Sequence, residues 1–113
     1  MKTSEMWEIL VPTEKRLKPD VGSPYYSTRY HKVWDAEIRK IAGGLTVLSP
    51  AKGQWISNDG VLFKERMIPV RIICTQDQIE TIIEHTLKYY DQLAVLAYKI
   101  SSEVILKHRG DSK

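Results

Sequence analysis

The second half of the 113-residue chain changes its hydrophobic period from strand to helix and back again. Two β-rich stretches, residues 45–57 and 61–74, lie on either side of the Asp59-Gly60 pair, which is a strong hairpin signal. A helical pattern follows, and an apolar run returns over residues 93–100. This half therefore predicts two antiparallel strands, a helix and a last core strand.

The first half adds one strand and one helix. Residues 7–11 are expected to form a strand, and the apolar run Ile9-Leu10-Val11 suits a central strand that is covered on both faces. Pro12 ends it because proline cannot donate to a strand ladder. Residues 28–42 then predict a helix, with Ser27 or Thr28 as the N-cap and Gly43 as its left-handed end. The apolar side chains on its predicted buried stripe are Trp34, Ile38, Ile41 and Ala42.

The resulting order, βαββαβ, predicts an α+β fold: a ferredoxin-like sandwich in which two helices cover one face of an antiparallel sheet. We expect a single domain over residues 1–113, with its core at about residues 5–108. Alternating side chains over residues 102–108 also predict an extra C-terminal edge strand. Two helices leave one sheet face for water or another subunit, so we expect a homo-oligomer.

Proline and glycine predict irregularities in the middle strands. Pro50 and Gly53 separate residues 45–48 from residues 54–57, which indicates a bulge or a bend. Pro69 lies within the long returning strand, where its missing N–H indicates a bulge or an edge position.

The second helix has the clearest start signal in the chain. It is expected from about Asp77, because Thr75 and Gln78 have the spacing of a capping box. Three isoleucines on one side of it are expected to face the core: Ile79, Ile82 and Ile83.

Charge and hydropathy narrow the classes of partner. The net charge is +3, and three of the cations lie in the long polar loop of residues 13–26: Lys15, Arg16 and Lys18. No nucleic-acid-binding motif accompanies them, so a nucleic-acid partner is not expected. No apolar run approaches the ~20 residues that span a bilayer, and residues 1–8 lack the apolar segment of a signal peptide. We therefore expect a cytoplasmic protein without a membrane partner.

No catalytic or metal-binding motif is present in the sequence. The one cysteine, Cys74, lies in an apolar run and is expected to be a small buried hydrophobe. The three histidines, His31, His85 and His108, share no ligand spacing with one another or with Cys74. We therefore predict no metal and no cofactor, and the catalytic residues, if there are any, stay unknown.

Trp55, Glu65 and Tyr98 are the candidate ligand-binding residues. Trp55 and Tyr98 lie on predicted strands, where an aromatic ring can pack a core, fill a subunit interface or stack on a flat ligand. Glu65 either forms a surface ion pair or offers a carboxylate to a ligand in a cleft. We expect the three side chains to approach one cleft, together with residues of a neighbouring subunit.

Short motifs over residues 43–107 resemble the PII-like branch of ferredoxin-like proteins and, within it, the phage enzymes that degrade S-adenosylmethionine. The residues that carry the resemblance are Gly44-Leu45, Gly53-x-Trp55, Glu65, Val70-Arg71-x-x-Cys74, Gln92 and Val95-Leu96-x-Tyr98-Lys99. The resemblance implies a trimer whose sheets face inward, with ligand clefts between the subunits. In the lyases, carboxylates and tyrosines in those clefts hold the substrate, and the strand carboxylate falls near Glu65. The segment that matches the long PII regulatory loop is short here, residues 57–60, so PII-type signalling is not expected.

Three functions fit these observations. The first is a homo-oligomer, with a trimer favoured, that binds a small ligand between its subunits. The second is a small enzyme that degrades S-adenosylmethionine or a related nucleoside compound. The third is a dimeric α/β-barrel protein with an enclosed pocket.

Overall fold

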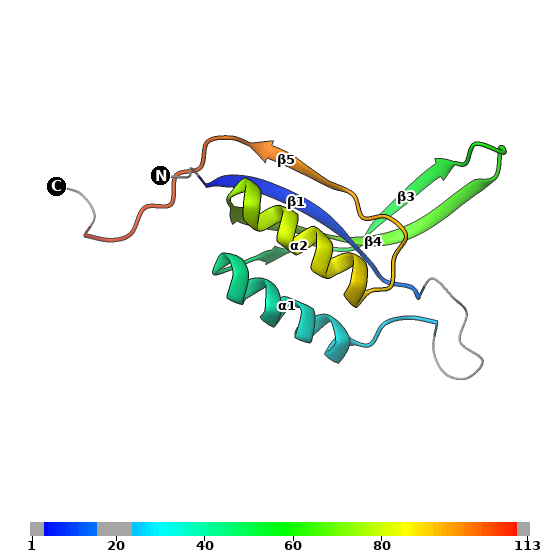
Figure 1. Cartoon of the computed structure of the whole chain (residues 1–113), viewed down its shortest axis with the longest axis horizontal. Coiled ribbons are helices and arrows are strands. Elements are labelled where there is room, and N and C mark those ends of the chain that lie inside the picture. Colours follow the sequence, from blue (N-terminus) through cyan, green and yellow to red (C-terminus); the bar gives the residue numbers. More distant parts are fainter. Residues whose placement is uncertain (1–3, 16–23, 111–113) are drawn as a thin grey trace.

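A computed structural model of the chain describes residues 4–15 and 24–110. Two helices pack on one face of a five-stranded antiparallel sheet (Figure 1), which confirms the predicted ferredoxin-like α+β sandwich. The elements are β1 (Glu5–Pro12), α1 (Thr28–Ala42), β2 (Thr46–Val47), β3 (Ala51–Ile56), β4 (Leu62–Cys74), α2 (Gln76–Tyr89) and β5 (Ala97–Ser101). The strand order is β2-β4-β1-β5, and β3 pairs with the other half of β4.

Some predicted features lie outside the described residues. These are residues 1–3, residues 111–113 of the expected tail, and Arg16 and Lys18 of the basic segment. In the part that is described, no helix is long and apolar enough to cross a membrane.

The core lies between the sheet and the helices. Alternate residues of β1 and β4 point toward the helices, as strand geometry requires, and meet one stripe of each helix. The buried side chains are Ile9, Val11, Trp34, Ile38, Val70, Ile72, Cys74, Ile79, Ile82 and Tyr90. The predicted core face of α2 is confirmed for Ile79 and Ile82, and Ile83 is partly buried against it.

The capping residues that the sequence predicted are present at both helices. Ser27 is the N-cap of α1, where its hydroxyl accepts a hydrogen bond from the Tyr30 N–H at 3.1 Å. Gly43 follows α1 with a φ of 92°, a conformation that glycine adopts without steric cost. Both hydrogen bonds of the Thr75–Gln78 capping box are present at the start of α2.

The β2–β3 edge carries one residue more than the strand beside it. The three residues 48–50 lie opposite the two residues 68–69, and one extra residue on one strand is what defines a bulge. Pro50 lies in this interruption, as predicted. Pro69 lies on β4 opposite this bulge, and its carbonyl accepts a hydrogen bond from the Leu48 N–H at 2.9 Å. The bulge interrupts the ladder at the place where Pro69 has no N–H to donate.

Three local predictions need correction. Gly53 does not interrupt a strand, because it lies within β3 opposite Glu65. The last core strand is β5, Ala97–Ser101, and not residues 93–100. The predicted extra edge strand over residues 102–108 is wrong: Ser101 already pairs with Met6 near the start of β1, so the chain beyond it has passed the end of its neighbouring strand.

The β3–β4 hairpin extends beyond the helices as an arm of residues 51–67 (Figure 1). Its turn is closed by a hydrogen bond from the Gly60 N–H to the Ser57 carbonyl at 3.0 Å. In the Asp59-Gly60 pair, only Gly60 takes a positive φ, at 83°.

A cluster of aromatic rings joins the start of α1 to the end of α2. The Tyr30 hydroxyl donates to the Tyr89 carbonyl, and the Tyr89 hydroxyl donates back to the Tyr30 carbonyl at 2.7 Å. The buried Tyr90 hydroxyl lies 2.7 Å from His31 Nδ1. Burial raises the pKa of Tyr90, so its hydroxyl stays protonated and donates a hydrogen bond to Nδ1 of a neutral His31.

Lowering the pH from 7.5 to 5.5 should therefore destabilise the fold. Burial lowers the pKa of His31, with partial opposition from the Asp35 carboxylate, so the unfolded chain binds a proton at a higher pH than the folded chain. Above a pH of about 6.5, the contribution of His31 to the free energy of unfolding is fully present. It is lost as the pH falls toward the lowered pKa of His31 in the folded chain. Urea titrations at both pH values measure this loss. In His31→Gln, the amide oxygen can still accept a hydrogen bond from the Tyr90 hydroxyl, but the side chain does not titrate, so the stability should depend less on pH. An unchanged pH dependence of the free energy of unfolding would contradict the role of His31.

Candidate functional site

The three predicted site residues lie on the sheet face that carries no helices. On β4, Val70 and Ile72 point toward the helices, so Glu65 points to the opposite face by strand alternation. Trp55 shares that face. Gly53 pairs with Glu65, and Trp55 lies two residues further along β3, so both residues of β3 face the same side as Glu65. Tyr98 shares it because β5 places it directly opposite Glu8, which alternates with the core residues of β1.

One chain does not bring the three side chains together. Glu65 is six residues along β4 from Arg71, and at ~3.3 Å per residue that separation is roughly 20 Å. Arg71 lies opposite Glu8 on β1, and Tyr98 is one strand further across the sheet. A cleft that holds all three therefore requires a second copy of the chain.

Tyr98 belongs to a polar network that crosses the middle of the open sheet face. Its hydroxyl donates to the Glu8 carboxylate, whose other oxygen accepts from Arg71 Nε at 3.0 Å. The three residues lie side by side on β5, β1 and β4. Glu8 is only 7% exposed, although no helix covers this face.

The network keeps the buried Glu8 carboxylate charged. The hydrogen bond from Tyr98 holds the pKa of Glu8 below its usual range, against the effect of burial, and Arg71 lowers it further. The same bond raises the pKa of Tyr98, which stays a donor. Sequence reasoning missed Glu8 because the run Ile9-Leu10-Val11 suggested a strand that is apolar on both faces. Its alternation with Ile9 and Val11 is the signal that places it opposite the core.

Trp55 stacks on Phe63 across the arm. The ring centroids are 4.5 Å apart and the rings are 13° from parallel. Trp55 is 49% exposed and Phe63 is 41% exposed, so the pair presents a large apolar surface to water. Further exposed apolar side chains lie around the tip of the arm: Ile56, Val61 and Leu62.

Glu65 is exposed on the arm, opposite Gly53. Its position borders a groove of about 290 Å³ at the base of the arm, which neither Trp55 nor Tyr98 lines.

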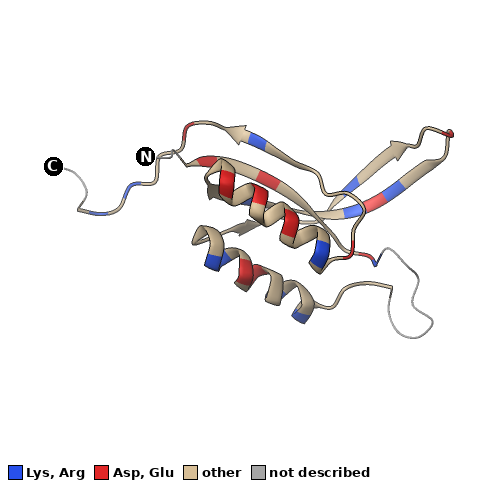
Figure 2. Ribbon diagram, in the orientation of Figure 1, with Lys and Arg blue, Asp and Glu red and all other residues tan. Residues whose placement is uncertain are grey.

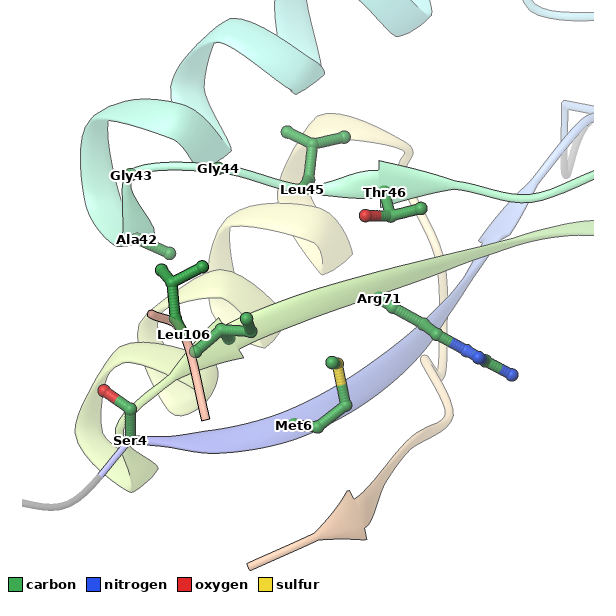
Figure 3. Close-up of a pocket in the computed structure, with 10 residues that line it drawn as sticks. Ser4, Met6, Ala42, Gly43, Gly44, Leu45, Thr46, Arg71 and Leu106 are labelled. Carbon is green, nitrogen blue, oxygen red and sulfur yellow. The ribbon is translucent and has the colours of Figure 1, made fainter. Parts of the chain in front are cut away.

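A larger groove of about 430 Å³ lies at the other end of the sheet, beside β2 and the end of α1 (Figure 3). Its lining is mostly apolar, and none of the predicted site residues contributes to it. Those that line it include Met6, Ala42, Leu45, Thr46, Arg71, Ile73 and Leu106. The sequence offered no signal for it, because its lining comes from segments far apart along the chain.

Cys74 is a buried thiol at the end of β4. Cys74 is 1% exposed, as predicted, and burial raises the pKa of its thiol to about 11, which keeps it unreactive. Over residues 4–15 and 24–110, no three histidine, cysteine, aspartate or glutamate side chains gather as a metal site does.

No protein-family model and no curated protein matches the chain by sequence, but solved structures match its fold. The divalent cation tolerance protein CutA from Archaeoglobus fulgidus matches with a TM-score of 0.65, at 11% identity, over 93% of this chain and 89% of that one. Cut A1 from Thermus thermophilus matches with a TM-score of 0.61, at 10% identity, over 95% and 89%.

A phage S-adenosylmethionine lyase, in complex with S-methyl-5'-thioadenosine, matches with a TM-score of 0.61, at 14% identity, over 89% of this chain and 92% of that one. Identities this low establish the fold alone. The matches support the ferredoxin-like α+β architecture that the sequence predicted.

Proposed function

We propose that this chain is a self-associating protein of PII-like fold that binds a small ligand in clefts between its copies. The observation that carries the proposal is the open sheet face, which bears the buried Glu8 network, together with an arm that leaves Trp55 and Phe63 about half exposed. Exposed apolar patches of this kind mark interaction sites on soluble proteins. A trimer is the favoured assembly, as the family resemblance implies.

Two sheet edges support association in addition to the open face. Among the described residues, β5 pairs only with β1 and β3 pairs only with β4, so each leaves a row of backbone donors and acceptors without a strand partner there. Such edges favour pairing with another chain unless something covers them. A neighbouring copy supplies that cover and brings its own Tyr98 toward the arm of the first.

The ligand chemistry follows from the side chains that such a cleft would hold. Trp55 and Tyr98 offer ring faces for a flat ring or a cation, and Glu65 offers a charged acceptor for a hydroxyl, an amine or a sulfonium. S-adenosylmethionine combines these groups. A solved relative in fold is named as a lyase of this compound, which makes it the first ligand to test.

Calorimetry tests the ligand part of this proposal. Wild type should bind S-adenosylmethionine or an adenine nucleotide, and Glu65→Gln should weaken the cationic ligand by about tenfold, because a charge-assisted contact is lost. Glu80→Gln, an exposed change on α2 of the same charge, is the matched control and should leave binding unchanged. If neither wild type nor Glu65→Gln binds any of these compounds, the ligand proposal is wrong.

Degradation of S-adenosylmethionine is the second candidate function, favoured by the likeness to the phage lyase. Formation of S-methyl-5'-thioadenosine from S-adenosylmethionine by the purified chain separates an enzyme from a binding protein. The dimeric barrel is separated from the trimer by molecular mass. The cytoplasmic location stays a prediction.

A further inference from the structure

The two faces of the arm differ in charge. On the face opposite Trp55 and Glu65, strand pairing places Lys52 directly across from Arg66, and Lys64 two residues further along β4. Figure 2 shows Lys or Arg positions in blue on both strands of the arm, which Figure 1 labels β3 and β4. The three side chains therefore share one face of a two-stranded ribbon.

This arrangement costs stability in the isolated chain. Like charges directly opposite each other on paired strands repel, and Lys52 and Arg66 are such a pair. Within the described part of the chain, none of the three cations forms an ion pair with a carboxylate. An anion on this face would relieve the repulsion.

The cations also border a hollow. Lys52, Lys64 and Arg66 line the groove of about 290 Å³ at the base of the arm, together with the Gln54 amide. Glu14 also lines the groove, and the neighbouring Thr13 hydroxyl donates to the Arg66 carbonyl at 2.9 Å. Glu65 also borders the groove, but its side chain points to the opposite face of the arm by strand alternation.

We infer that this basic face of the arm binds a small anion with two or three linked phosphate groups. Directly opposed side chains begin ~5 Å apart, and side chains two residues apart along a strand begin ~7 Å apart, so three cations surround a short span. Linked phosphates carry several charges over such a span, whereas a single carboxylate carries one. Lysine and arginine are the usual donors to phosphate oxygens.

Inorganic triphosphate is the probe for this site, titrated into the full chain at low salt. Lys52→Gln, Lys64→Gln and Arg66→Gln should each weaken its binding by about tenfold, as the loss of one charge-assisted hydrogen bond predicts. Glu14→Gln removes a carboxylate that lines the groove and should strengthen binding. Lys40→Gln, on the exposed side of α1, removes the same charge elsewhere and should change affinity by less than about twofold.

These changes in triphosphate affinity distinguish a defined binding site on the arm from a general attraction between the basic chain and an anion. If Lys40→Gln weakens triphosphate as much as the arm variants do, or if wild type does not bind it, the inference is wrong. If only a DNA duplex binds, and the arm variants weaken that binding, the face is a nucleic-acid surface and not a site for a small anion. If the arm variants change the molecular mass but not triphosphate binding, the face meets another copy instead. None of these outcomes depends on S-adenosylmethionine binding, which tests the other face.

Discussion

Trp34→Ala should destabilise the fold by about 3–5 kcal/mol, as expected for removing the largest side chain of a packed core. Trp34 is 1% exposed, and its Nε1 donates to the Thr86 hydroxyl at 3.0 Å. That hydroxyl in turn donates to the Ile82 carbonyl at 2.6 Å, so the indole joins α1 to α2 by packing and by a hydrogen bond. Urea unfolding followed by circular dichroism measures the change.

Two variants separate these contributions. Trp34→Phe keeps most of the apolar ring and loses the hydrogen bond, so it should cost about 1–3 kcal/mol. Val33→Ala, one residue earlier on α1 and 46% exposed, should stay within about 0.5 kcal/mol. A Trp34→Ala variant as stable as Val33→Ala would mean that the two helices do not pack through this ring.

Ile82→Ala should cost about 2–5 kcal/mol, because a fully buried side chain is replaced by a cavity. Ile82 is 0% exposed and belongs to the stripe of α2 that faces the sheet. Ile82→Val removes one methylene group and should cost about 0.5–1.5 kcal/mol, which gives a graded series at one position. The same urea titration measures both.

The exposed side of α2 provides the control for this series. Glu84→Ala should change the free energy of unfolding by no more than about 0.5 kcal/mol. An equally small effect for Ile82→Ala would show that the helix is rotated and that this stripe faces solvent.

The architecture was predictable because its signals are local. The caps at Ser27 and Thr75 and the isoleucine stripe of α2 are each set by neighbours a few residues away along the chain. The strand predicted over residues 102–108 failed for a non-local reason. Its alternation was real, but a strand also needs a partner, and β1 starts at Glu5.

The candidate site was less accessible to sequence reasoning. Pleat alternation places Trp55, Glu65 and Tyr98 on one face, which can be derived once the register is known. The burial of Glu8 could not be derived, because it depends on Tyr98 and Arg71, each more than 60 residues away along the chain. Whether the three candidates meet depends on a second copy, and the order of residues within one chain does not encode that geometry directly.

Association is the central claim, and molecular mass in solution tests it most directly. Light scattering on the full chain at micromolar concentration should give about three times the 13.1 kDa of one chain. Trp55→Asp with Phe63→Asp places two charges on the apolar face of the arm and should lower the mass, while circular dichroism shows that the fold is kept. A wild-type mass of 13.1 kDa at these concentrations would contradict the account, because the open sheet face and the arm would then stay uncovered.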